Sequence, residues 1–161
     1  MDNKFYCFLQ SLDDISFVQP ITDELNRLYE LSSGKLPEMF IEVYSQTVPE
    51  CEVNFDSLVF YDIKRIIDEN TEYIPGANIL PFGFFTFAST LDGDGICFDL
   101  NNKDFPVYCC PHEIFCDENE INYCDNGKIL TAELNYSNII KFSHKTADSF
   151  EEFIDDLISD I

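Results

Sequence analysis

The sequence predicts an α+β fold in which N-terminal helices and a C-terminal helix pack on a mixed, mainly antiparallel β-sheet. Apolar residues recur at helical spacing between residues 20 and 72, and strand-like alternation begins at Ile79. The last segment returns to helical spacing. Helices followed by a run of strands favour an α+β fold over alternating β-α-β units. A chain of 161 residues with 16 Phe has enough apolar material for one domain spanning residues 1–161.

The N-terminal third is predicted to be helical. We expect residues 1–19 to form an N-terminal arm that packs through its Phe, Leu and Ile side chains. After Pro20, apolar residues at helical spacing predict a helix that ends at Gly34. Pro37 suits the first position of a second helix, because its missing N–H needs no partner there, and Pro49 marks the end of that helix.

A strand, a third helix and a turn follow. Residues 57–61 read as a short strand, and Asp62 is suited to cap the helix after it. Ile63 and Ile66 give this helix an apolar face, and residues 73–76 form a turn.

The sheet is predicted mainly from the second half of the chain. Between its strands lies an acidic, turn-rich segment, residues 113–134, in which Asn126-Gly127 is a strong hairpin turn. Ser149 and Glu152 are spaced as a capping box, and an apolar stripe from Phe150 to Ile161 predicts a helix docked on the core. The predicted strands are residues 79–88, 95–100, 106–110 and 139–143.

The acidic glycine stretch Asp92-Gly93-Asp94-Gly95 could be a calcium loop, a catalytic carboxylate pair or a turn. An EF-hand loop counted from Asp92 would need glycine at the sixth position and glutamate at the twelfth, where this chain has Cys97 and Lys103. Two aspartates on one short turn seldom face each other across a cleft, as a glycosidase pair must. Glycine and aspartate suit tight turns, so we expect a hairpin turn.

A cysteine–histidine cluster is the other candidate for chemistry, because thiolates and imidazole are good zinc ligands. The cluster has no CxxC motif, and adjacent cysteines on a strand point to opposite faces. A Cys–His nucleophile is opposed by the acidic surroundings, which raise the pKa of a thiol. We therefore expect a protein that is not an enzyme, with no catalytic residue, cofactor or metal. The cluster comprises Cys109, Cys110, His112, Cys116 and Cys124.

The net charge of −22 bears most directly on function. The 31 acidic residues are spread along the whole chain, which rules out a neutral domain with an acidic tail. Such a field repels nucleic acid and anionic membranes and attracts basic proteins, although it also serves solubility. We find no signal peptide or membrane-spanning stretch, so we expect a cytoplasmic protein whose seven cysteines are free thiols.

One segment concentrates this charge beside aromatic residues. Between Lys103 and Lys128 there are six acids and no Lys or Arg, with Phe115 and Tyr123 among them. Aromatic anchors favour interfaces, so this segment is our candidate partner-binding surface, and an ordinary solvated loop is the alternative. The candidate residues are Asp104, Glu113, Phe115, Asp117, Glu118, Glu120, Tyr123 and Asp125.

Several short motifs occur together in a characteristic order. They are Leu36-Pro37, Ile79-Leu80-Pro81-Phe82, Gly93-Asp94-Gly95-Ile96-Cys97-Phe98-Asp99-Leu100, Pro106-Val107-Tyr108 and Ser149-Phe150-Glu151-Glu152-Phe153-Ile154. In order and spacing the chain resembles the SUKH superfamily, and within it the SMI/KNR type named for yeast cell-wall assembly regulators. The resemblance covers residues 20–160. The chain departs from it in lacking Trp and in carrying Thr47-Val48-Pro49-Glu50 where a glycine-rich turn is common.

The resemblance implies an α+β domain without accepted catalytic residues. Many bacterial members resemble immunity proteins that bind a cognate toxin, often a nuclease, and block it. Our leading hypothesis is an immunity protein for a basic toxin domain. The alternatives are a regulatory or scaffold interaction protein and, third, a metal-binding protein built on the cysteine–histidine cluster. The exposed face of the sheet could hold a toxin or a second copy of the chain.

Overall fold

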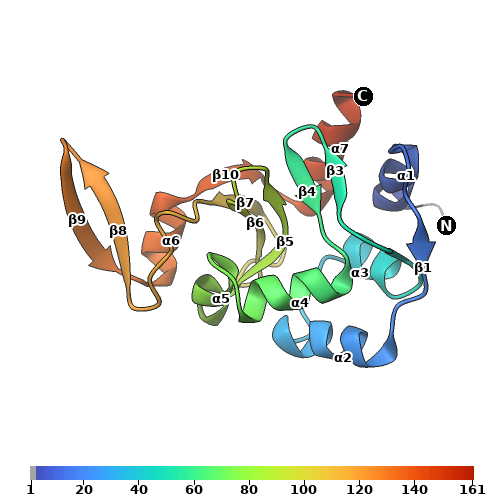
Figure 1. Ribbon diagram of the computed structural model, residues 1–161, viewed down its shortest axis with the longest axis horizontal. Coiled ribbons are helices and arrows are strands. Elements are labelled where there is room, and N and C mark those ends of the chain that lie inside the picture. Colours follow the sequence, from blue (N-terminus) through green and yellow to red (C-terminus); the bar gives the residue numbers. More distant parts are fainter. Residues whose placement is uncertain (1–2) are drawn as a thin grey trace.

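The computed structural model describes residues 3–161 and shows a central sheet covered by helices, with one hairpin extending from the body (Figure 1). This arrangement confirms the α+β prediction. The helices are α1 (Lys4–Ser11), α2 (Thr22–Leu31), α3 (Glu38–Tyr44), α4 (Ile63–Thr71), α5 (Gly76–Ile79), the 3-10 helix η1 (Leu80–Phe82), α6 (Tyr136–Phe142) and α7 (Phe150–Ser159). The strands are β1 (Phe17–Val18), β2 (Val48–Pro49), β3 (Val53–Phe55), β4 (Leu58–Phe60), β5 (Phe84–Thr90), β6 (Gly95–Asp99), β7 (Val107–Cys110), β8 (Glu120–Asp125), β9 (Lys128–Glu133) and β10 (His144–Ala147).

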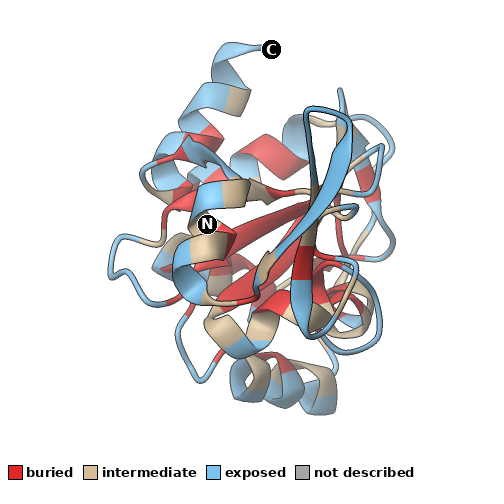
Figure 2. Ribbon diagram, turned by 90° about the vertical axis from the view of Figure 1, so that its left-hand side faces the viewer, coloured by how far each residue is buried: buried red, intermediate tan, exposed pale blue. Residues whose placement is uncertain are grey.

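The main sheet has six strands in the order β10-β7-β6-β5-β4-β3, and every pairing in it is antiparallel. Two small sheets, β1-β2 and β8-β9, lie apart from it. The central strand β6 is buried along its whole length, because helices lie on both faces of the sheet (Figure 2). Over residues 3–161 the longest helices have ten residues, and no helix is long and apolar enough to cross a bilayer.

Aromatic rings in stacked and edge-to-face contacts fill the space between the sheet and α1, α3 and α7. Phe98 of β6 lies 4.2 Å from Phe87 of β5, centroid to centroid, and 5.1 Å from Phe150 of α7. Phe5 of α1 lies 5.0 Å from the same Phe150 ring, and Phe40 of α3 lies 5.3 Å from Phe98. All five rings are buried, and such aromatic pairs stabilise a core beyond the area they bury. The predicted packing of the C-terminal helix on the core is confirmed for its first turns, whereas Ile158 and Ile161 at the end of the predicted stripe are exposed.

In the predicted N-terminal arm, residues 1 and 2 lie outside the described residues, and the rest contains α1, which is integrated into this core, and β1. Asn3 caps α1 by accepting a hydrogen bond from the Tyr6 N–H, while its amide donates to the Met39 carbonyl and to Glu42. After α1, Phe17 and Val18 pair with Val48 and Pro49 as the β1-β2 ribbon.

An asparagine side chain replaces a missing strand beside β5. Strand β4 pairs with β5 only at residues 88–90, so the backbone of Thr86 lies beyond its end. Asn70 of α4 fills this place: it donates to the Thr86 carbonyl (2.7 Å) and accepts from the Thr86 N–H (2.9 Å). Both residues are buried, so these bonds satisfy backbone groups that water cannot reach.

The strand predicted at residues 79–88 is wrong in its first half and confirmed from Phe84 onward, and the strand predicted at 139–143 is wrong. Residues 79–82 end α5 and form η1, and β5 begins only at Phe84, because Pro81 suits a helical turn and Gly83 then adopts a positive φ of 87°. Residues 139–143 belong to α6 and the residue that caps its C-terminus. There Asn135 accepts a hydrogen bond from the Asn138 N–H, and this cap starts a helix that the apolar run alone did not reveal.

Several local signals are confirmed. Asp62 caps α4 by accepting from the Arg65 N–H, and Ser149 caps α7 by accepting from the Glu152 N–H. The Glu152 carboxylate accepts from the Asp148 N–H, one residue before the position that a regular capping box uses. The turn after Thr90 connects β5 with β6, so the hairpin prediction for the acidic glycine stretch is correct.

Candidate functional site: an acidic hairpin and its surroundings

Most of the candidate partner-binding residues lie in the part of the molecule that extends from the body. The loop over residues 111–119 leads into β8, which pairs with β9 through the Asn126-Gly127 turn. Figure 1 shows this hairpin at one end of the molecule, with β9 farther from the sheet than β8. The acidic side chains of this loop and of β8 are mostly exposed, as predicted. Asp117 is half-buried, and the exposed ones are Glu113, Glu118, Glu120 and Asp125.

Three candidate residues lie differently from what the sequence suggested. Phe115 is fully buried under the hairpin and offers no contact area to a partner. Tyr123 is half-buried, with its ring 4.7 Å from that of Phe142 in α6. Both aromatics therefore anchor the hairpin to α6 and the sheet. Asp104 is exposed, but it lies in the β6–β7 loop, apart from the hairpin.

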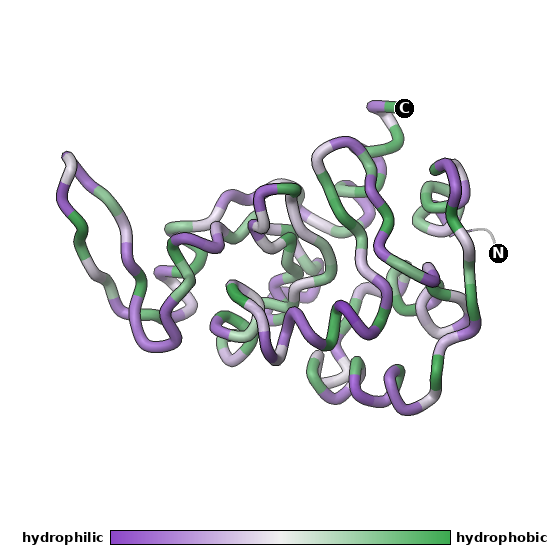
Figure 3. The backbone as a smooth tube through the Cα atoms, in the orientation of Figure 1, coloured by the Kyte–Doolittle hydropathy of each residue, from purple (hydrophilic) through white to green (hydrophobic). Residues whose placement is uncertain are grey.

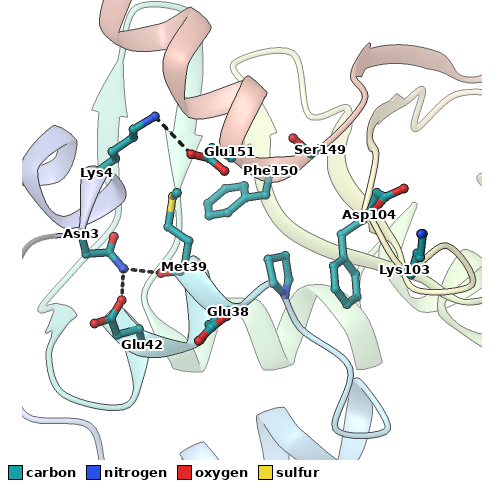
Figure 4. A pocket seen from close by; sticks show the side chains of 12 residues that line it. Asn3, Lys4, Glu38, Met39, Glu42, Lys103, Asp104, Ser149, Phe150 and Glu151 are labelled. Carbon is teal, nitrogen blue, oxygen red and sulfur yellow. Dashed lines mark hydrogen bonds and ion pairs between the residues drawn. The ribbon is translucent and has the colours of Figure 1, made fainter.

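Asp104 lines a separate hollow of about 670 Å³ (Figure 4). Its walls are the starts of α1, α3 and α7 and the β6–β7 loop. Lys4 lies in it but is bound to Glu151 (3.2 Å) and Asp155 (2.9 Å). The other charged residues that line the hollow are Glu38, Glu42, Lys103 and Asp104. Because they include both signs, the hollow does not select for a ligand of one charge.

The two faces of the β8–β9 hairpin differ in chemistry. Alternate residues of a strand point to opposite faces, and directly paired residues share a face. One face carries Ile121, paired with Ala132, and Tyr123, paired with Leu130, and it contacts the core beside α6. The other face carries the pairs Glu120–Glu133, Asn122–Thr131 and Cys124–Ile129. The tube coloured by hydropathy shows this mixture of hydrophobic and hydrophilic residues along both strands (Figure 3).

The acidic glycine turn holds the start of the loop. The Asp94 carboxylate accepts from the His112 N–H (3.0 Å) and lies 2.8 Å from the Nδ1 atom of the same residue. Gly93, at φ 96°, allows the turn that presents this carboxylate. Sequence reasoning identified the turn but missed this contact, because the two residues are 18 positions apart.

The cysteine–histidine cluster is dispersed in space. Cys109 packs with the aromatic core on one face of the sheet. Cys110 packs with a second apolar cluster on the other face, as expected for neighbours on one strand. Cys116 and Cys124 are exposed. Burial, reinforced by Asp94 and Cys110, raises the pKa of Cys109 to about 11, which opposes thiolate formation. Within residues 3–161 no three His, Cys, Asp or Glu side chains come together as metal ligands.

An apolar groove of about 630 Å³ lies between the β3–β4 hairpin and α7, where the sequence suggested no site. Phe55, Leu58, Ile96 and Phe153 line it. His144 lies at its edge, directly opposite Cys109 in the pairing of β10 with β7. No local pattern could show this groove, because its walls come from four distant parts of the chain.

Most of the few Lys and Arg side chains form ion pairs within the protein. Five of the nine Lys and Arg side chains form ion pairs with acids among the described residues 3–161. This leaves most of the 31 acids without a cation at ion-pair distance in residues 3–161. The paired cations are Lys4, Arg27, Lys64, Arg65 and Lys145.

Comparison with known proteins identifies the family. No curated protein and no solved structure matches the chain. The family model described as the SMI1 / KNR4 family (SUKH-1) matches residues 20–156, which is most of the chain. The chain therefore belongs to the SMI1 / KNR4 (SUKH-1) family.

Proposed function

We propose that this protein is a non-enzymatic binding protein that neutralises a cognate toxin with a basic surface, as an immunity protein does. One observation carries the proposal: the net charge is −22, and within residues 3–161 few of the acids are neutralised by cations of the chain. Membership of the SUKH-1 family agrees with a binding role, because the superfamily resemblance implies immunity proteins among its bacterial members.

The charge suits one class of target. A nuclease toxin must hold phosphate groups and therefore presents a basic groove. An acidic inhibitor is steered toward such a groove, and association driven in this way reaches about 10⁸–10⁹ M⁻¹s⁻¹ at low salt. Binding of this kind needs no catalytic group on the inhibitor, only acids on a surface that can enter or cover the groove.

We place the contact on the loop before β8 and on the outer face of the β8–β9 hairpin. Glu118 and Glu120 are exposed there, and Glu120 lies directly opposite Glu133. Like charges directly opposite each other destabilise a hairpin. A basic group of the partner between Glu120 and Glu133 would remove this repulsion, which favours binding. Phe115 and Tyr123 support this surface from below and are not part of the contact.

The test is a co-expression rescue in a bacterial host. The gene immediately upstream of this one is expressed with and without this protein, and cell growth is followed. We expect toxicity that this protein relieves. A well-expressed neighbour that is harmless, or whose toxicity is unchanged, would contradict the proposal and shift weight to a regulatory role.

Charge reversal locates the contact. The double variant Glu118→Lys/Glu120→Lys should lose rescue and bind the toxin at least tenfold more weakly, since buried or central charge pairs cost several kcal/mol to disrupt. The matched control is Asp13→Lys/Asp156→Lys, which changes the net charge equally at exposed sites on other elements. Equal effects of the two variants would show that only total charge matters.

A further inference from the structure

We propose that the free edge of β9 is the docking site for an extended, basic segment of the partner, which adds to the β8–β9 hairpin as a third strand. The identity of the natural partner rests on the proposed function, whereas the edge itself is tested separately below. Strand β9, residues 128–133, contains none of the candidate partner-binding residues predicted from the sequence.

The two edges of the hairpin are not equivalent. On the β8 side, the Asn122 N–H donates to the Ile114 carbonyl (3.4 Å), so the loop before β8 partly covers that edge. On the β9 side, β8 is the only strand that pairs with β9 in residues 3–161. Figure 2, which looks from this side of the molecule, shows the hairpin in front and coloured mainly as exposed.

The pairing register identifies the backbone groups that point outward. The two-residue turn joins Asp125 and Lys128, which form a hydrogen-bonded pair, and such pairs alternate with non-bonded ones along the ladder. Asn122 and Thr131 are then a non-bonded pair with outward-pointing groups. The hydrogen bond from the Asn122 N–H outward to the Ile114 carbonyl agrees with this alternation of bonded and non-bonded pairs. The N–H and C=O groups of Ile129 and Thr131 and the N–H of Glu133 therefore face the free edge. The Glu133 carbonyl, at the end of the strand, already accepts a hydrogen bond from the Asn138 side-chain amide (2.9 Å).

This edge has little of the protection that exposed strands usually carry. Natural edges are blunted by proline, by several lysines, by bulges or by a covering element. Strand β9 has six residues, one lysine and no proline, and no register shift interrupts its pairing with β8. Ile129 is 81% exposed at its end. An unprotected edge of this kind is suited to strand addition, in which main-chain bonds give affinity and side chains give specificity.

Charge identifies the occupant as basic. The face that holds Ile129 also holds the opposed carboxylates Glu120 and Glu133. A strand laid along β9 with Lys or Arg on this face would pair with them, and an apolar residue could contact Ile129. A second copy of the chain is disfavoured, because each copy carries a net charge of −22.

The experiment uses the full ¹⁵N-labelled chain and a synthetic peptide, acetyl-Lys-Val-Lys-Val-Lys-amide, as the probe. Peptide addition should shift the amide signals of Ile129, Thr131 and Glu133 most strongly. Two further peptides carry N-methyl groups, one on its valines and one on its lysines. An added strand bonds its neighbour through every second residue, so one methylated peptide should bind and the other should not.

Two variants at one position complete the design. Thr131→Pro removes an outward N–H, which edge strands tolerate, and should weaken peptide binding about tenfold. Thr131→Ala keeps the N–H and should bind within about twofold of wild type. Circular dichroism and the retained signals of Tyr123 and Leu130 show whether the hairpin persists in each variant.

Several results would overturn the inference. These are the absence of peptide binding, shifts confined to residues 111–119, equal binding of both methylated peptides, or equal binding by the two Thr131 variants. A concentration-dependent dimer in sedimentation, lost in Thr131→Pro, would assign the edge to a second copy instead. None of these readouts depends on toxin rescue, so failure of the edge and failure of the proposed function are distinguishable.

Discussion

Asn70 should be among the most sensitive polar positions in the protein. Its side chain is 2% exposed and makes hydrogen bonds to both backbone groups of Thr86, which is fully buried. The variant Asn70→Ala leaves that N–H and that C=O without a partner. Each unsatisfied buried group costs about 1–3 kcal/mol, so the free energy of unfolding should fall by about 2–6 kcal/mol.

The lower end of that range applies if a water molecule enters the space left by the amide. Because small domains are stable by only about 5–15 kcal/mol, even this loss is readily measured. Urea unfolding with linear extrapolation gives the change, and hydrogen exchange at the Thr86 amide reports the local effect. The matched control is Asn26→Ala, an exposed asparagine in α2, where alanine favours the helix and stability should not decrease. If the free energy of unfolding of Asn70→Ala lies within about 0.5 kcal/mol of the wild-type value, the claim that Asn70 replaces a strand beside Thr86 is wrong.

Three further predictions follow from the core and the thiols. Phe98→Ala removes the ring between Phe87 and Phe150 and should lower the free energy of unfolding by about 3–5 kcal/mol in urea titrations, and a change below about 1 kcal/mol would contradict the packing described. Burial raises the pKa of Cys109 from 9.0 to about 11, so stability is retained below pH 9 and declines as the pH rises to about 11. In Cys109→Ala that part of the decline should disappear from unfolding curves measured across this range, whereas an unchanged slope would refute the assignment. A thiol reagent at pH 8 should label the exposed cysteines quickly, the partly buried Cys109 more slowly, and Cys97 and Cys110 only on unfolding. Uniform labelling would show that the sheet is open. The exposed cysteines are Cys7, Cys51, Cys116 and Cys124.

The features predicted correctly from sequence are those set by short-range chemistry. The Asn126-Gly127 turn, the Asp62 cap and the Ser149 cap each depend on residues within a few positions of one another. The wrong strand at residues 139–143 shows the limit of this approach. Apolar residues 139–143 fit a strand or a buried helix equally well, and the Asn135 cap together with packing under the hairpin decides for the helix.

The candidate site was predictable in its charge but not in its geometry. Acids close in sequence do lie together on the loop and β8, because they belong to one hairpin. The burial of Phe115 was not predictable, because local sequence does not reveal which aromatic residue faces the core. The free edge of β9 was not predictable either, since it depends on which strands are absent beside it, and this is a property of the whole topology.

The central claim, that acidic charge drives binding to a basic toxin, is tested most directly by the association rate with the cognate toxin at increasing salt. Between ionic strengths of about 0.01 M and 1 M the Debye length shrinks from about 30 Å to about 3 Å, which removes long-range steering. We predict that the association rate constant falls at least tenfold over this range, and falls less for Glu118→Lys/Glu120→Lys. An association rate that does not change with salt would contradict the claim and leave the charge of −22 as a feature of solubility.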